Sequence, residues 1–446
     1  MTNSPGAMPP AAVDLLLRNA AVVDGDGLRA DVDIAIRGEE IVDVGPESSR
    51  PAAVTVDCRG LVLVPGSGNA HHHLVTGLLR GAPPPAAPTR NQRERLERVV
   101  WPFERRLTHT DVRAAIRIGL LEAIVAGTTL VIDHHVSSGC IPGVLGLIAE
   151  EFAAAGVRGI LCYEITDRDG EAVAAAGLAE TDRFLSGGAT GERIAGMVGL
   201  HALSTVGHET LARAVALAER HGVGLHLHLG ESTHDNDDSL ARYGARPVLR
   251  LLAAGGLSST TLLAHAIHVD DDEARLLGEA ETMVAHLPRS NAANGVGVAN
   301  LAHLQELGCT LGLGGDGFTQ EMRAELALFP LLQRQERRDP TLMPPRAAVD
   351  IGLAGNAAIA ARLGHSRLGR IAAGYTADLV ALRYETAVPL LAENALWHLA
   401  AGFPNATVRH LWIGGQLVLR DGECRTIDQE RARHDAAAAF ARLWGT

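Results

Sequence analysis

The sequence SGNAHHH at residues 67–73 introduces the pattern on which the interpretation of this chain depends. A short run that suits a strand ends in three consecutive histidines. In an extended chain, residues two positions apart point to the same side, so His71 and His73 can face one metal ion while His72 faces away. The stretch therefore predicts a strand whose end delivers two imidazoles to a metal site.

Seven further short apolar runs follow through the middle of the chain. They cover residues 128–133, 159–163, 196–200, 224–229, 261–264, 282–285 and 310–314. Amphipathic stretches rich in Ala, Leu and Arg, such as 210–220 and 246–254, lie between them. Strands that alternate with helices about every 30 residues are typical of an α/β fold, here a (β/α)₈ TIM-like barrel rather than an open sheet. The first interval is longer, and its Pro-rich part, 82–92, predicts a loop over the barrel mouth.

Each predicted strand is followed by a histidine or an acidic residue. After His71 and His73 these residues are His134 and His135, Glu164, His201, His228 and Glu231, His265, His286, and Asp316. Barrel enzymes build their active sites at the carboxyl ends of the strands. Because only 20 of the 446 residues are histidine, their recurrence at these ends favours one shared site over coincidence.

Three imidazoles and one carboxylate form the predicted metal-binding set. In GLHLHLGE, residues 224–231, His226 and His228 share a face, and we prefer His228 as the ligand because it lies nearer the rim; His226 is either a second candidate or a packed neighbour. Asp316, in GGDG at 314–317, supplies a carboxylate oxygen unless it only forms the turn. Three His and one Asp suit one divalent metal ion, with Zn²⁺ preferred and Fe²⁺ as the alternative, and leave a position for water.

Two residues near these ligands are candidates for proton transfer and water positioning. Glu231 lies three residues after His228 and is the predicted general acid/base, the alternative being a solvated surface glutamate. His265 ends the sixth strand and could orient the attacking hydroxide or polarise the substrate. His268 is expected outside the metal's immediate neighbours.

Both ends of the chain differ from the middle in their pattern of predicted secondary structure. Residues 13–64 contain short strands at 14–18, 21–24, 32–36, 40–44, 54–57 and 61–64, separated by turn residues. Runs at 378–383, 408–413 and 416–419 return near the other end, with Gly414–Gly415 as a hairpin turn. We predict that residues 1–66 and 366–446 form one small β-sandwich domain beside a catalytic barrel of residues 67–365.

Composition excludes several kinds of chemistry and of partner. All 40 basic residues are arginine, which excludes Schiff-base and pyridoxal-phosphate lysines, a P-loop lysine and a carbamylated lysine bridging two metals. The net charge of −12 and the lack of a dense basic patch argue against nucleic acid. No run of about 18 apolar residues predicts a membrane span. Five scattered cysteines without a Cys-x-x-Cys motif predict free thiols. Since Met1–Ala12 also lacks signal-peptide features, we expect a soluble cytoplasmic protein.

The ordered set of motifs resembles the amidohydrolase superfamily over almost the whole chain. Within it, the branch of deaminase- and chlorohydrolase-like enzymes is most similar, and SsnA-type aminohydrolases most of all. The segments that carry the resemblance are 65–66 with 69–73, 131–135, 162–168, 199–202, 228–231, 264–265, 289–291, 314–317 and 374–379. The chain departs from the family pattern at Gly315, where Thr is usual, and at Ala292–Ala293, where bulkier residues are usual.

The resemblance implies roles for individual residues. It implies that His71, His73, His228 and Asp316 bind a single metal ion, that Glu231 carries the proton, and that His265 positions the water. It also implies a catalytic role for Asp316 beside its role as ligand. The substrate-contacting residues that we predict are His201, Ser290, Asn291, Glu164 and His135.

The function that we predict is a mononuclear-metal-dependent hydrolase, an aminohydrolase or deaminase. It would act on a C–N bond of a nitrogen heterocycle and release ammonia or an amine, and the resemblance implies a purine-, pterin- or triazine-like ring. The alternatives are a ring-opening cyclic amidase, a dehalogenating hydrolase on a similar ring, and a barrel that binds metal without catalysis. The resemblance also implies a homo-oligomer, a dimer or larger, with a small molecule as its substrate.

Overall fold

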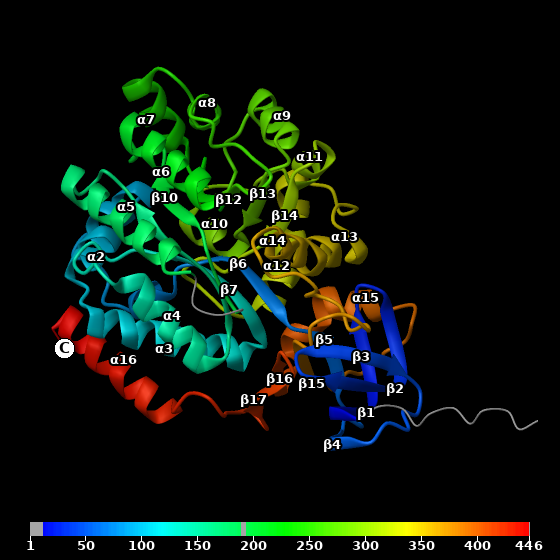
Figure 1. The fold of residues 1–446 in the computed structure, drawn as a ribbon. Coiled ribbons are helices and arrows are strands. Elements are labelled where there is room, and N and C mark those ends of the chain that lie inside the picture. The colour runs from blue at the N-terminus through cyan, green and yellow to red at the C-terminus, as the bar shows by residue number, and fades with distance from the viewer. Residues whose placement is uncertain (1–11, 189–192, 446) are drawn as a thin grey trace, which may run out of the picture.

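The computed structural model describes residues 12–188 and 193–445 and has two parts (Figure 1). A barrel surrounded by helices contains the middle of the chain, and a smaller sheet beside it combines strands from both ends. The predicted architecture is confirmed. The prediction that Met1–Ala12 is not a signal peptide concerns residues that, apart from Ala12, lie outside the described ranges.

Eight parallel strands form the barrel in the order in which they occur along the chain. They are β6 (Ser67–His72), β7 (Thr128–His135), β8 (Arg158–Ile165), β10 (Val198–Ala202), β11 (Leu225–Leu229), β12 (Leu262–His265), β13 (Met283–His286) and β14 (Thr310–Leu313), with β9 (Ile194–Gly196) paired to β8. The run predicted at 196–200 is thus divided between β9 and β10. A parallel bridge between His72 and Asp316 joins the last segment to the first. The chain therefore brings residue 316 beside the histidines of β6.

Alternating side chains along each strand separate the barrel interior from the layer between strands and helices. Leu130 and Ile132 of β7 pack into the interior with Ala70 and residues of other strands. Val131, between them, belongs to the outer core. Side chains two residues further along the same face reach the carboxyl end of the barrel, where the predicted site lies.

Helices follow the strands and cover the barrel (Figure 1). They are α3 (His109–Ala126), α4 (Val144–Ala155), α5 (Glu171–Ser186), α6 (His208–His221), α7 (Thr233–Tyr243), α8 (Pro247–Ala253), α9 (Asp271–Glu279), α10 (Pro288–Asn294), α11 (Leu301–Glu306), α12 (Met322–Arg337), α13 (Pro345–Val349), η3 (Asp350–Gly355) and α14 (Asn356–Arg362). Local sequence sets the ends of α3. Thr108 and Asp111 form a capping box at its start, and Gly127, with a φ of 79°, ends the helix.

The long first interval lies at the barrel mouth. It contains η1 (Leu74–Leu79), α1 (Gln92–Arg95), η2 (Leu96–Val100) and α2 (Trp101–Arg106). Gly81, just before the predicted Pro-rich loop, and Gln92, its last residue, both line the cavity above the barrel. This segment therefore contributes to the walls of the site.

The smaller sheet has the order β18-β17-β16-β15-β5-β1-β2-β3, with β4 paired to β1. Its strands are β1 (Val13–Asp24), β2 (Gly27–Arg37), β3 (Glu40–Gly45), β4 (Ala52–Asp57), β5 (Val62–Pro65), β15 (Leu379–Arg383), β16 (Thr407–Ile413), β17 (Gln416–Arg420) and β18 (Glu423–Cys424). The two strands predicted at 14–18 and 21–24 are one strand, β1. Its pairing is irregular around Asn19, whose φ is 58°, so one strand continues through a local bend.

The C-terminal segment leaves the sheet before the chain ends. It passes α15 (Ala395–Trp397), η4 (His398–Gly402) and η5 (Phe403–Asn405) before β16, and α16 (Gln429–Trp444) then packs along α3 of the barrel (Figure 1). Arg442 of α16 pairs with Asp111 of α3. Segment 366–446 thus contacts both parts of the structure.

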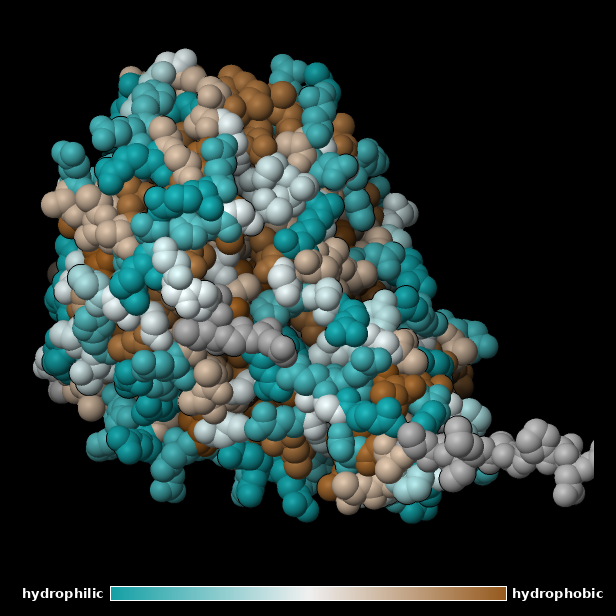
Figure 2. Space-filling view, viewed as in Figure 1, coloured by the Kyte–Doolittle hydropathy of each residue, from teal (hydrophilic) through white to brown (hydrophobic). Residues whose placement is uncertain are grey.

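Most of the face seen in Figure 2 is hydrophilic, and apolar side chains gather over α8 at the top of the view. Leu249 and Leu252 of α8 are both exposed. Within residues 12–188 and 193–445, none of the helices combines the length and apolarity needed to cross a bilayer. The five cysteines are free thiols, as predicted.

Candidate metal centre and active site

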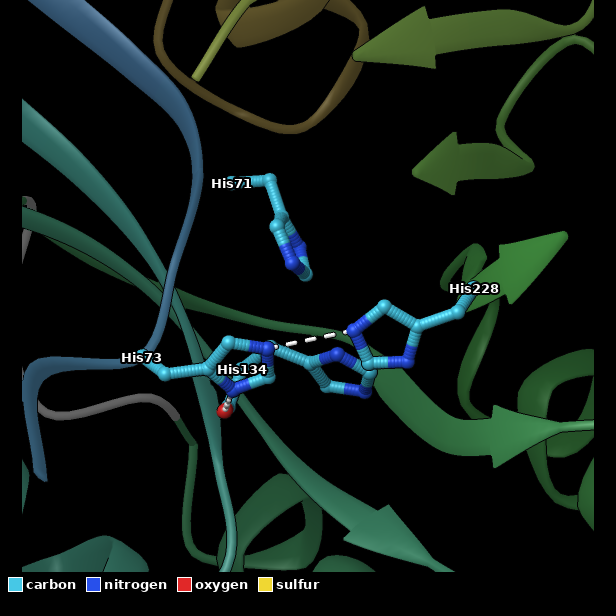
Figure 3. A group of neighbouring side chains, drawn as sticks. All are labelled: His71, His73, His134 and His228. Carbon is cyan, nitrogen blue, oxygen red and sulfur yellow. Dashed lines mark hydrogen bonds between the residues drawn. The ribbon is translucent and has the colours of Figure 1, made fainter. Parts of the chain in front are cut away.

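Four imidazoles converge at the carboxyl end of the barrel (Figure 3). His71 and His73 come from the end of β6, His134 from β7 and His228 from β11, and one ring nitrogen of each lies within 4.8 Å of those of the others. The Nε2 atoms of His73 and His228 are 3.1 Å apart. All four side chains are buried, so the geometry concentrates nitrogen donors in a space screened from water.

Hydrogen bonds on the far side of three rings determine which nitrogen carries the proton. Nδ1 of His73 lies 2.6 Å from the His134 carbonyl oxygen, and Nδ1 of His228 lies 2.9 Å from that of His201. A carbonyl oxygen only accepts, so Nδ1 of each ring donates and Nε2 keeps its lone pair. The two lone pairs face each other across 3.1 Å and repel each other, and a cation between them would turn this repulsion into attraction.

His226 likewise determines which ring nitrogen of His71 carries the proton. Its Nδ1 donates to the Leu262 carbonyl oxygen at 2.9 Å, so its Nε2 is an acceptor. Nδ1 of His71 lies 2.8 Å from that Nε2 and therefore donates, which leaves Nε2 of His71 with a lone pair directed to the centre. His226 thereby fixes the orientation of the His71 ring, as hydrogen-bond partners behind metal ligands do. Of the two roles left open for His226, the structure favours the packed neighbour.

Asp316 adds a carboxylate to this centre. Its Oδ1 is 3.4 Å from Nε2 of His73 and 3.8 Å from Nε2 of His71. Ser290 donates a short hydrogen bond to Oδ2. Burial opposes ionisation, but the positive charges that His73 and His265 carry when protonated, together with the Ser290 hydroxyl, outweigh it and hold the pKa of Asp316 below its ordinary value. Asp316 is therefore an anion beside nitrogen lone pairs.

Burial keeps the imidazoles in the form that binds metals. It lowers the pKa of His71, His73 and His228, and the neighbouring histidines lower the pKa of His71 and His228 further. Neutral imidazole is the ligating form. The centre thus presents three neutral nitrogens and one negative charge.

Glu231 and His265 lie together at the side of this centre. Oε2 of Glu231 is 3.5 Å from Nε2 of His265, and Nδ1 of His265 lies 2.8 Å from Oδ1 of Asn291. Burial raises the pKa of Glu231 to about 7. His265 and Ala266 both have positive φ, 74° and 50°, a conformation that L-residues rarely adopt and that is commoner at functional sites. Glu231 can therefore accept and return a proton near neutral pH.

A cavity of about 360 Å³ opens onto these residues. Trp101, Phe318 and Leu96 supply large apolar side chains to its wall, and His73, His228, Glu231, His265 and Asp316 line its floor. A second lobe of about 390 Å³ shares Trp101, His201 and Glu231 with it and continues past Ser204 to Tyr243. The volume and mixed lining suit a small, partly aromatic ligand.

A buried group of three charges forms part of the cavity wall. Arg168 pairs with Glu104 through a short contact and with Glu164 at 2.9 Å, and its guanidinium carbon lies 5.2 Å from the Trp101 ring centre. Glu164, a predicted substrate contact, lines the cavity but already accepts from Arg168. Trp101 and Glu104 do not follow from the sequence pattern, because no strand end marks either residue.

The other predicted contacts occupy two different positions. His201 lines the cavity, and its Nδ1 bonds Thr205 Oγ1 at 2.6 Å. Ser290 and Asn291 lie behind Asp316 and His265 and support them. The structure thus brings His201 to the cavity and places Ser290 and Asn291 behind the residues that line it.

The prediction that His135 contacts substrate is not supported by its orientation. Its Nε2 bonds Ser137 at 2.9 Å, and its ring lies 6.2 Å from Tyr163 in the outer core. The reason is strand alternation: Leu130 and Ile132 point inward, so His134 does as well and His135 points outward. The same alternation rule could have identified His134 from the sequence.

Comparison with known proteins identifies the family and the fold of this chain. The sequence profile of the Amidohydrolase family matches residues 62–418. The chain is 30% identical over 440 residues to a 5-methylthioadenosine/S-adenosylhomocysteine deaminase of Desulforudis audaxviator, covering 96% of this chain and 99% of the relative. A Halobacterium salinarum protein of the same name is 31% identical over 437 residues, covering 96% and 98%. The crystal structure of an adenosine deaminase from Xanthomonas campestris with bound zinc superposes with a TM-score of 0.86 at 24% identity, covering 98% and 100%.

Proposed function

The chain belongs to the amidohydrolase family and is a metal-dependent hydrolase of carbon–nitrogen bonds other than peptide bonds, and we propose that it removes the exocyclic amino group from an adenine-type nucleoside with one Zn²⁺. The observation that carries the proposal is the convergence of three Nε2 lone pairs and one carboxylate beside the Glu231–His265 pair. The names of the relatives, which are adenosine-type deaminases, favour this substrate class.

The donor set fits a single divalent ion. Buried Nε2 of His71 has no hydrogen-bond partner among the described residues, although its tautomer leaves a lone pair there. With His73, His228 and Asp316, it completes the three-nitrogen, one-oxygen set common to catalytic zinc sites. Zinc in the Xanthomonas campestris enzyme favours Zn²⁺ over Fe²⁺. When bound, such an ion supplies Lewis acidity and favours ionisation of a nearby water at neutral pH.

The residues of the chain account for the proton movements. Glu231, with its raised pKa, takes a proton from the attacking water and returns it to the ring nitrogen, while His265, held by Asn291, orients the water. A C–O bond forms, the remaining proton of the new hydroxyl group passes to the amino nitrogen, and the C–N bond breaks, so that ammonia leaves and the ring carbon becomes a carbonyl. Trp101 and Phe318 provide flat apolar surfaces for the heterocycle.

The test is ammonia release from the metal-loaded protein with adenosine, 5′-substituted adenosines and aminated triazines as substrates. Glu231→Gln should abolish turnover and keep the metal, whereas Glu279→Gln, on the exposed end of α9, should change neither. Near-wild-type turnover of Glu231→Gln would refute the proton-transfer role. With a cyclic amide added to the panel, a new carboxylate without ammonia would instead identify a cyclic amidase, and with a chlorinated triazine, halide release would identify a dehalogenase.

Two further expectations remain predictions about the protein in solution. We expect a homo-oligomer and a cytoplasmic location, the first from the family resemblance and the second from the free cysteines. Analytical ultracentrifugation measures the first, and fractionation of the source cells measures the second.

A further inference from the structure

We propose that His134 is a fourth imidazole ligand of the metal centre, placed on the side that faces the barrel interior. The proposal adds a residue to the metal site assumed in the proposed function and rests on that site. His134 is not part of the ligand set implied by the family resemblance. Its position, burial and lack of partners carry the inference.

The fold directs His134 toward the centre. It follows Leu130 and Ile132 on the inward face of β7, the strand next to β6. Its backbone carbonyl already holds Nδ1 of His73 at 2.6 Å, so this part of β7 adjoins the ligands directly. His134 therefore reaches the same space as the predicted ligands from a neighbouring strand.

The His134 ring lies among the rings of the other histidines, 4.6 Å from that of His226. The His134 ring centre lies 4.9 Å from that of His228, 5.4 Å from that of His73 and 5.5 Å from that of His71. One ring nitrogen of His134 lies within 4.8 Å of one ring nitrogen of each of these three residues (Figure 3). Two ligands of one metal ion, each at about 2.0–2.1 Å, lie at most about 4.2 Å apart, so a small movement of the ring suffices.

Among the described residues, His134 has no side-chain hydrogen bonds that would compensate for its burial. Its side chain is 0% exposed, and neither ring nitrogen has a hydrogen-bond partner among the described residues. An imidazole buried in this way loses its hydrogen bonds to water without replacement. A metal ion at the centre would use the lone pair of one nitrogen and remove part of this penalty.

His286 provides a matched comparison within the same barrel. It also ends a strand, is fully buried and lacks partners on both ring nitrogens within the described part of the chain. It is outside the four-histidine group, and its ring lies 6.3 Å from that of Phe329. Missing hydrogen bonds alone therefore do not identify a ligand, and proximity to the other nitrogens distinguishes His134.

A fourth imidazole changes the expected coordination. With Asp316 the chain offers four nitrogens and one oxygen, which favours first-row transition ions over Mg²⁺ and Ca²⁺ more strongly than three nitrogens do. It also predicts tighter retention of the metal. Both properties can be measured without turnover.

The experiment uses the full-length protein loaded with Zn²⁺ or with Co²⁺. X-ray absorption of the wild-type zinc form should count four imidazoles, a measurement that needs no variant. His134→Leu should reduce the count to three, alter the visible spectrum of the Co²⁺ form, and weaken Zn²⁺ binding in competition with a chelator by about tenfold or more. His286→Leu should leave the count, the spectrum and the affinity unchanged.

A count of three in the wild type, or a His134→Leu protein with wild-type spectrum and affinity, would overturn the proposal. Failure to bind metal stoichiometrically would overturn it together with the metal site. Four imidazoles in a protein that releases no ammonia from any substrate would support His134 as a ligand and contradict only the proposed function. The two proposals can thus fail separately.

Discussion

Replacing Arg168 by methionine tests the buried charges in the cavity wall. Arg168 lies between the carboxylates of Glu104 and Glu164, and all three side chains are almost completely buried. Burial raises the pKa of both carboxyls, and Arg168 opposes that rise. Arg168→Met keeps the approximate length of the side chain but leaves two buried acids without their cation.

The expected loss is large for a single side chain. Removing one partner from a buried ion pair costs about 3–5 kcal/mol. Unfolding entropy of about 2.1 cal/mol/K per residue gives about 0.9 kcal/mol/K for a chain of 446 residues. The variant should therefore melt about 3–5 °C below the wild type near neutral pH.

The loss should also depend on pH. Without Arg168, the folded-state pKa of each carboxyl rises further above its unfolded value of about 4.3, so the folded protein binds more protons than the unfolded one. Such groups favour folding at low pH and lose that contribution as the pH rises through the folded pKa. The wild-type folded pKa is about 7 for Glu104 and about 8 for Glu164. As the pH rises above these values, the deficit in stability relative to wild type should grow by up to about 1.4 kcal/mol per pH unit for each carboxyl.

Melting curves from far-ultraviolet circular dichroism at about pH 5.5 and about pH 8 measure both effects. The triple variant Arg168→Met, Glu104→Gln, Glu164→Gln should recover most of the loss, because no unpaired charge remains. Arg346→Met, which breaks an exposed pair with Asp350 at 3.5 Å, should change stability by less than about 1 kcal/mol. An Arg168→Met protein as stable as wild type at both pH values would refute the reasoning.

Three further predictions concern the support of the metal site, the contact between the two parts, and the metal itself. Ser290→Ala removes the hydrogen bond to Asp316 and should weaken Zn²⁺ binding by about 10–100-fold in chelator competition; unchanged affinity would exclude a positioning role. Arg158→Leu leaves buried Asp378 without its partner at 3.1 Å and should cost about 3–5 kcal/mol, seen as a lower Tm, whereas Arg367→Leu, in an exposed pair, should stay within about 1 kcal/mol. Zn²⁺ at about 1,000 times its Kd should stabilise the metal-free protein by about 4 kcal/mol, and a Tm unaffected by chelator would contradict a metal bound in the folded state.

Much of the fold and part of the site followed from local sequence patterns. Eight short runs, each ending in a histidine or an acid, were enough to predict the barrel and the end that carries the site. Strand alternation separated His71 and His73 from His72, and the structure brings Asp316 within 3.4 Å of His73. These features could be predicted because side chains alternate along every strand, and because the carboxyl ends of parallel barrel strands all lie on one side of the barrel.

Only the tertiary structure decided which side chains share the space above the barrel. His226 supports His71 across 155 residues, and Arg168 reaches Glu104 across 64. No periodicity encodes such pairs, because they depend on how neighbouring strands and the long first interval pack together. His134 illustrates the limit: strand alternation separates it from His135, but only the packing of the strands shows that it lies beside His71, His73 and His228.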